Sequence, residues 1–205
     1  MRWSLLILCA LATPAFADDS STPPPTFHKG QIGISARLSA GAEAIATYDS
    51  KYYCGTVDST AAHGFAPVCA GRSPVSLGLE GSYGVARHVE LVLELRLGLE
   101  KDFGGAPNLD GPHPLFLAPG ARFFFSEAAR TRVFVQPEVV FDFTGYKDSA
   151  GMDRGNDFGF RGLEGIWIDL HRTYGMYAFV GETLTFVRWI DAGFEAGVGF
   201  QGRYP

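Results

Sequence analysis

VELVLELRLGLE, residues 89–100, has Val or Leu at every odd position and mostly charged residues between them. Side chains of a β-strand alternate between two faces, so this stretch has one aliphatic and one largely charged face. In a soluble sheet, the aliphatic face would be packed against helices or a second sheet. Other stretches of the chain repeat the alternation, and too few helical stretches are present to cover them. The pattern therefore favours a closed β-barrel with lipid outside and charge inside.

The strand pattern extends over most of the chain. Strands are expected at about residues 30–43, 73–83, 89–100, 114–125, 132–146, 158–171, 176–188 and 191–204. Short and long connections alternate, as in barrels whose short turns face the periplasm. We predict an all-β, antiparallel, up-and-down transmembrane β-barrel of about eight strands, with both termini on the periplasmic side.

Two features interrupt the regular pattern. Pro119 and Pro137 fall inside expected strands, where proline predicts a bulge or imperfect pairing. Glu164 shares the parity of the apolar residues of its strand. Either a bulge near Gly162 or Gly165 resets the phase, or Glu164 lies near a membrane interface.

Residues 1–17 are typical of a secretory signal peptide. Arg2 precedes the apolar run 5–12, and Ala15-Phe16-Ala17 fits the cleavage rule. The apolar run is shorter than the roughly 20 residues of a membrane helix. Residues 18–29 are expected to form a disordered Pro-rich leader, and residues 30–205 the barrel domain. No later apolar run is long enough for a membrane helix, so a membrane-spanning form must be a barrel.

From about residue 30 to residue 205, the chain resembles the small outer-membrane β-barrels, such as the transmembrane domain of outer-membrane protein A and related porin-like barrels. The resemblance rests on the signal peptide, the strand rhythm and the closing segment FEAGVGFQGRY, residues 194–204. It implies export to the outer membrane of a Gram-negative-type envelope, contact with outer-membrane lipid and lipopolysaccharide, and insertion by the barrel assembly machinery. That machinery usually reads a terminal aromatic residue; here Tyr204 is penultimate.

Charged residues gather on the expected inner face. They are Arg37, Glu80, Glu90, Glu94, Arg96, Arg122, Glu138, Arg161, Glu182 and Glu195, with Glu100, Asp142, Asp169, Arg188 and Arg203 beside them. Lone charges in a narrow lumen are costly, so these groups are expected to pair or to meet trapped water. Eight strands leave an interior that side chains can fill. The sequence thus predicts a salt-bridged plug, with a gated ion path as the alternative; the resemblance implies the same Arg–Glu pairing.

The expected first outer loop carries the other candidate residues. Cys54 and Cys69 are the cysteines that remain after signal cleavage, and they are expected to form a disulfide, with two free thiols as the alternative. Tyr48, Tyr52 and Tyr53 offer contact area suited to surface recognition, or they belong to the outer aromatic girdle.

Other functional classes are less favoured. The net charge of −5 and the lack of a Lys/Arg cluster argue against a nucleic-acid partner. No histidine lies in a His-x-Ser arrangement on a strand, which disfavours a lipid-modifying hydrolase or acyltransferase. Asp148, Asp153, Asn156 and Asp157 match no EF-hand spacing, so a solvated acidic loop is expected, with no metal and no cofactor. The predicted function is structural or surface recognition of an extracellular or periplasmic protein, with a narrow porin-like channel as the alternative.

Overall fold

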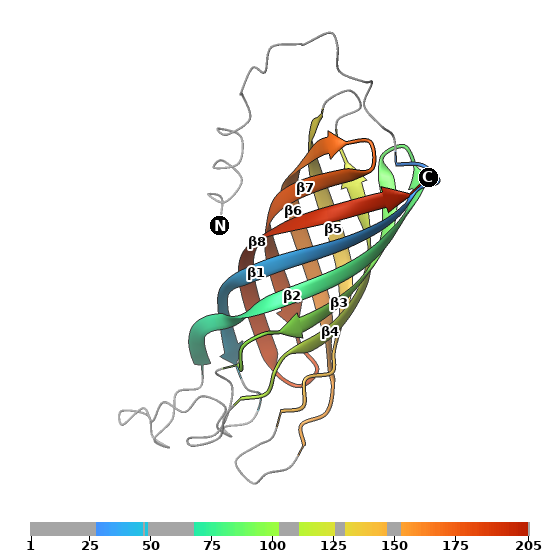
Figure 1. Ribbon diagram of the computed structural model, residues 1–205. Helices are drawn as coiled ribbons and strands as arrows, with labels where there is room; N and C mark the ends of the chain where they lie inside the picture. Colours follow the sequence, from blue (N-terminus) through green and yellow to red (C-terminus); the bar gives the residue numbers. More distant parts are fainter. Residues whose placement is uncertain are drawn as a thin grey trace, which may run out of the picture.

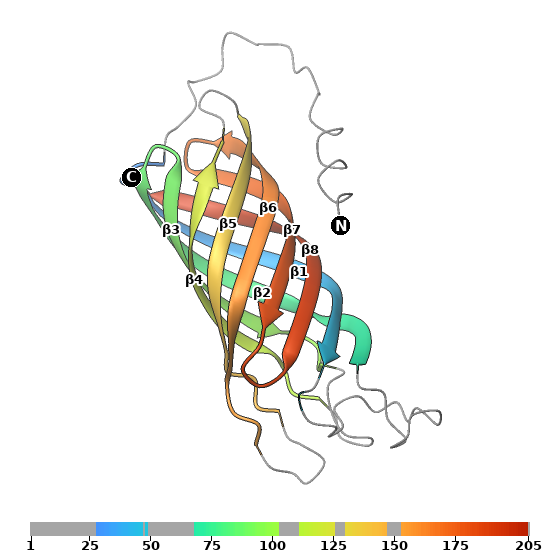
Figure 2. The same ribbon diagram turned by 180° about the vertical axis from the view of Figure 1, so that it is seen from behind.

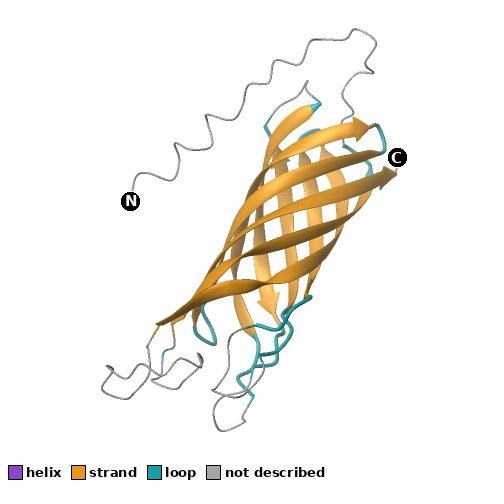
Figure 3. Ribbon diagram, turned by 60° about the vertical axis from the view of Figure 1, so that its left-hand side comes forward, coloured by secondary structure: helices purple, strands orange, loops and turns teal. Residues whose placement is uncertain are grey.

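A computed structural model describes residues 28–46, 48, 68–102, 111–125, 130–146 and 153–204. Its eight β-strands are β1 (Ile32–Ala46), β2 (Val68–Ala86), β3 (Val89–Gly98), β4 (Leu115–Phe124), β5 (Thr131–Asp142), β6 (Asp157–His171), β7 (Tyr174–Thr185) and β8 (Ile190–Tyr204). Consecutive strands pair antiparallel and β8 pairs with β1, so the sheet closes into a barrel (Figures 1 and 3). No helix within these ranges is long and apolar enough to cross a membrane.

The connections divide the barrel into two ends. Short turns join β2 to β3 and β6 to β7 at one end, the turn end, where β1 begins and β8 also ends (Figures 1 and 2). The longer connections, residues 47–67, 99–114 and 143–156, emerge at the opposite end, called the loop end below. This arrangement confirms the predicted up-and-down topology.

The two faces of the wall differ as the alternation predicts. In β3, Leu91 and Leu93 are 52% and 51% exposed on the outside of the barrel, whereas Glu94 is 0% exposed in the lumen. Aliphatic and aromatic side chains make up most of the exposed outer face of the other strands as well. A barrel with charge inside and apolar residues outside is adapted to lipid rather than to water.

Several local expectations require correction. The first hairpin is longer than predicted, since pairing continues to Ala46 and Val68. The β4–β5 ladder contains no register shift, so the bulge suggested by Pro119 and Pro137 is absent from that pair. The expected imperfect pairing is confirmed, because the recorded partners skip both prolines. The β5–β6 ladder has no shift either, so Glu164 is not displaced by a bulge and faces outward.

The predicted phase of β7 is wrong. Tyr177 and Phe179 face the lumen, where they are 1% and 4% exposed, and Glu182 faces out. The reason is that the lumen beside β7 is aromatic, so hydrophobicity does not mark the outer face of this strand. Glu100, also expected inside, lies near the loop end, paired with the exposed Arg72.

Some predictions concern parts of the chain outside these ranges. Residues 1–17 and 18–27 lie there, as do Cys54, Tyr52 and Tyr53. The signal peptide and the disulfide therefore stay predictions, and of Cys69 only the backbone is described. The last part of the expected leader does pack, because His28 is buried in the end of the barrel.

Candidate functional site: the charged lumen

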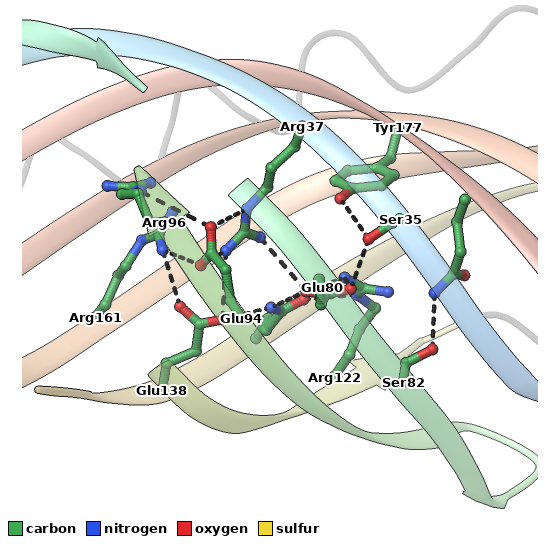
Figure 4. Close-up of polar contacts among 12 residues, drawn as sticks. Ser35, Arg37, Glu80, Ser82, Glu94, Arg96, Arg122, Glu138, Arg161 and Tyr177 are labelled. Carbon is green, nitrogen blue, oxygen red and sulfur yellow. Dashed lines mark hydrogen bonds and ion pairs between the residues drawn. The ribbon is translucent and has the colours of Figure 1, made fainter. Parts of the chain in front are cut away.

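The centre of the lumen holds a chain of alternating arginine and glutamate side chains (Figure 4). The Arg37 Nε donates to Glu94 Oε1 at 2.7 Å, and Arg161 Nη1 donates to Glu94 Oε2 at 2.5 Å. Arg161 also pairs with Glu195, which accepts from Arg96 Nη2 at 2.7 Å. These five residues come from β1, β3, β6 and β8, so the chain of ion pairs crosses the barrel.

A second cluster lies nearer the turn end and is centred on Arg122 of β4. Arg122 Nη2 donates to both oxygens of Glu80, at 2.7 and 2.9 Å, and Nη1 donates to Glu90 at 3.1 Å. Its Nε donates to Gln136 Oε1 at 2.6 Å. The Gln136 amide in turn donates to Glu80 and to Glu138, at 2.8 and 2.7 Å. Gln136 therefore joins the two clusters into one network.

Among the described residues, the seven buried Lys or Arg side chains are all arginines. A guanidinium offers five donors in a planar fork, so it can serve several carboxylates at once, which an ammonium does less well. Buried ion pairs contribute little net stability, but removing one partner leaves an uncompensated charge. The stability of the network is therefore sensitive to the loss of any one member.

Aromatic residues share the lumen with the charges. Phe124, Phe134, Leu163, Trp167, Tyr177 and Phe179 form a buried apolar cluster. The Arg122 guanidinium lies 5.3 Å from the ring centroids of Phe134, Trp167 and Tyr177. Such contacts stabilise a cation by cation–π attraction. The apolar cluster therefore packs directly against the charged network at Arg122.

His28, which the sequence assigned to a disordered leader, is buried at the turn end of the lumen. Its side chain is 1% exposed and its ring lies edge-on to Phe124, with centroids 4.9 Å apart. Arg132 Nη2 lies 2.7 Å from His28 Nε2. Because arginine can only donate, Nε2 accepts and Nδ1 is left to contact the Glu90 carboxylate. Backbone hydrogen bonds from Gly30 to Gly84 and back to Gln31 hold this segment in place.

Replacing His28 with alanine is expected to lower the free energy of unfolding by about 1–3 kcal/mol, because Arg132 and Glu90 each lose a buried partner. It should also expose Trp167, whose ring centroid lies 5.9 Å from that of His28. In a Trp189→Phe background, Trp167 is the only tryptophan after residue 17. Acrylamide quenching of its fluorescence should then rise. His171→Ala, at an exposed turn, is the control and should change neither value. Unchanged quenching in His28→Ala would contradict the shielding of Trp167 by His28.

The loop end has its own set of buried polar contacts. Arg188 donates to Asp142 Oδ2 at 2.5 Å and to the Thr144 carbonyl at 3.1 Å, and its guanidinium lies 4.2 Å from the Tyr146 ring centroid. Asp157 accepts from the backbone of Val187 at 2.7 Å. Asp157 is therefore buried and bonded rather than part of a solvated loop. A cavity of about 60 Å³ lies between this end and the central network, lined by groups that include Glu43, Ser73, Asp102 and Asp191.

The structure brings together nine of the ten predicted network residues. Arg37, Glu80, Glu90, Glu94, Arg96, Arg122, Glu138, Arg161 and Glu195 are all buried in the lumen, and Glu182 is not. Sequence reasoning missed Arg132, which faces the lumen in phase with Gln136, and it missed His28. Parity could have identified Arg132, whereas no periodic signal marks His28. Tyr48 is 60% exposed and donates to the Phe186 carbonyl at 2.6 Å, which places it at the loop end.

The closed eight-stranded wall, the apolar outer face and the charged lumen define the class: the protein is an integral outer-membrane β-barrel. No protein-family model and no curated protein sequence matches the chain. Several solved structures, however, are similar to the chain.

The N-terminal barrel domain of Pseudomonas aeruginosa OprF has a TM-score of 0.56 at 12% identity, over 86% of this chain and 98% of that one. Neisserial surface protein A has a TM-score of 0.54 at 13% identity, over 83% and 98%. Outer membrane protein AlkL has a TM-score of 0.51 at 12% identity, over 89% and 94%. At these identities the similarity concerns the fold.

Proposed function

We propose that the protein is a closed barrel with a structural and surface-recognition role, in which the outer loops make the contacts. The observation that carries this proposal is the ion-pair chain from Arg37 through Glu94 and Arg161 to Arg96, which crosses the lumen at mid-barrel. His28 and Arg188 add closing contacts at the two ends. A lumen filled in this way leaves the loop end as the surface open to a partner.

The loop between β1 and β2 is the principal candidate for recognition. It is a long connection, residues 47–67, and it carries Tyr52, Tyr53 and the cysteine Cys54. Tyrosine supplies large amphipathic contact area with few rotatable bonds. Ala46 and Val68 are the last paired residues, so a two-residue Asn-Gly turn can replace the loop without changing the register.

The loop replacement tests recognition. The full chain and the variant with residues 47–67 replaced by Asn-Gly are each placed in lipid nanodiscs. Binding of lipopolysaccharide and of an array of secreted proteins is then measured for both. We expect at least one ligand that the full chain binds and the variant loses. Both proteins should keep the heat-dependent gel mobility of a folded barrel. Equal binding of every ligand by both proteins would count against recognition through this loop.

The enzyme alternative has less support. Among the described histidines, His28 is the one that is buried, and it has carboxylate neighbours. It lies against Phe124 and Trp167 inside the turn end of the barrel. His88, His113 and His171 lie near strand ends or turns. Incubation of the protein with labelled lipopolysaccharide is expected to release no acyl chain; release would favour a lipid-modifying hydrolase.

A further inference from the structure

Two glutamates face the lipid on neighbouring strands. Glu164 is the middle residue of the 15-residue β6 and is exposed on the outer face. Its cross-strand partners are Val135 on β5 and Val180 on β7. Glu182 is exposed on the outer face of β7, opposite Gly162 on β6 and Phe194 on β8. A strand needs about 9–11 residues to cross the hydrocarbon, so the middle of β6 lies within it.

Glu164 and Glu182 both lie next to Gly162, a position without a side chain. Gly162 lies two residues from Glu164 on β6 and directly across from Glu182, so the glutamates are diagonal neighbours, typically about 7–8 Å apart at Cα. Gly162 has no side chain, and nothing lies within 4 Å of the place where a Cβ would stand. Pro137 of β5 lies on the other side of Gly162. Strands β5, β6 and β7 lie side by side in Figure 2.

These carboxyl groups differ from those in the lumen. Each lumen carboxylate of the central network contacts an arginine, whereas Glu164 and Glu182 have neither a hydrogen bond nor an ion pair with any residue that the structure describes. The remaining outward residues of β6 and β7 are apolar, aromatic or glycine, apart from His171 at the turn. Ionisable groups that face hydrocarbon are costly and usually mark a functional contact.

We propose that the outer face of β6 and β7 around Glu164, Gly162 and Glu182 is an intramembrane docking site for another membrane protein, one that presents a Lys or Arg side chain from its lipid-facing surface. Charge complementarity selects this partner. A second copy of the chain fits less well: on the outer faces of its described strands the exposed cation is Arg72, which lies near the loop end and is paired with Glu100. The bare Gly162 lets the cationic side chain approach between both carboxylates.

A model partner tests the chemistry. The refolded full chain, labelled with a donor dye, is placed in phosphatidylcholine vesicles. The vesicles also contain an acceptor-labelled Leu/Ala transmembrane peptide of about 21 residues with one central Lys. Energy transfer from donor to acceptor measures binding. Control peptides carry Leu or Glu at that position. We expect the Lys peptide to bind at least about ten-fold more tightly than the Leu peptide, a difference of about 1.4 kcal/mol, and the Glu peptide to bind no better than Leu.

Variants of the chain locate the contact. Glu164→Gln with Glu182→Gln should reduce binding of the Lys peptide to the level of the Leu peptide, whereas Glu100→Gln should leave it unchanged. Equal binding of the Lys and Leu peptides, or full binding by the double variant, would overturn the proposal. Energy transfer between two labelled copies of the chain would also overturn the proposal, if the double variant abolished it. The face would then be a contact between two copies of the chain. All variants are expected to keep the heat-dependent mobility shift of a folded barrel, because Glu164, Glu182 and Glu100 lie outside the buried network.

Discussion

Arg122→Ala is expected to lower the free energy of unfolding by about 3–5 kcal/mol, the largest effect of any substitution in the lumen. The guanidinium is 0% exposed and donates to Glu80, Glu90 and Gln136. Its removal leaves two buried carboxylates short of a cation and also removes contacts with three aromatic rings. Urea titration of the protein refolded in lipid vesicles, followed by tryptophan fluorescence, measures the change.

Two companion variants separate charge from packing. Arg72→Ala removes an ion pair whose side chains are 65% and 42% exposed, so it should cost less than about 1 kcal/mol. Adding Glu80→Gln to Arg122→Ala should recover part of the loss, because one unpaired carboxylate becomes neutral. An unfolding midpoint of Arg122→Ala equal to that of the unsubstituted protein would contradict the salt-bridged plug.

Gly199→Val is expected to lower the free energy of unfolding by about 1–3 kcal/mol through overpacking. Gly199 of β8 faces the lumen, and a Cβ there would lie 2.2 Å from Cζ of Tyr177, its cross-strand neighbour on β7. Tyr177 cannot easily move, because its ring is stacked on Trp167 with centroids 5.1 Å apart. The same urea titration measures the effect.

A mutant cycle and an outward glycine provide the controls for this prediction. In a Tyr177→Ala background, the cost of Gly199→Val should fall, since the ring that causes the clash is absent. Gly81→Val on the outer face of β2 has nothing within 4 Å and should leave stability unchanged or raise it. If Gly199→Val proved as harmless as Gly81→Val, the packing of Tyr177 onto β8 would be wrong.

Most of the wall could be predicted from the sequence because lipid outside and charge inside impose a period of two. β3 is the clearest case, with Leu and Val outside and Glu90, Glu94 and Arg96 inside. β7 reverses this rule: Tyr177 and Phe179 face in and Glu182 faces out. A signal was available in β8, where Gly197 and Gly199 leave room inside the barrel for two large side chains from the neighbouring strand.

The positions of His28 and Glu164 could not be predicted in the same way. His28 follows a proline-rich segment, and only the three-dimensional placement of Glu90, Arg132 and Asp169 at the turn end gives it partners. The ambiguity at Glu164 arose because a lipid-facing carboxyl group breaks the hydrophobic rule. The structure resolves it: the β5–β6 register is continuous, so the glutamate keeps the outward phase of Ile166 and Ile168.

Planar-bilayer recording of the refolded full chain tests whether the lumen is closed to ions. Ion pairs among Arg37, Glu94, Arg161 and Glu195 cross the barrel at its centre. We expect side chains paired in this way to leave no continuous path for hydrated ions. The membrane current is expected to stay at the baseline of the protein-free bilayer, in a preparation whose gel mobility changes on heating. Steady, large conductance from that preparation would contradict it and would favour the narrow porin-like channel.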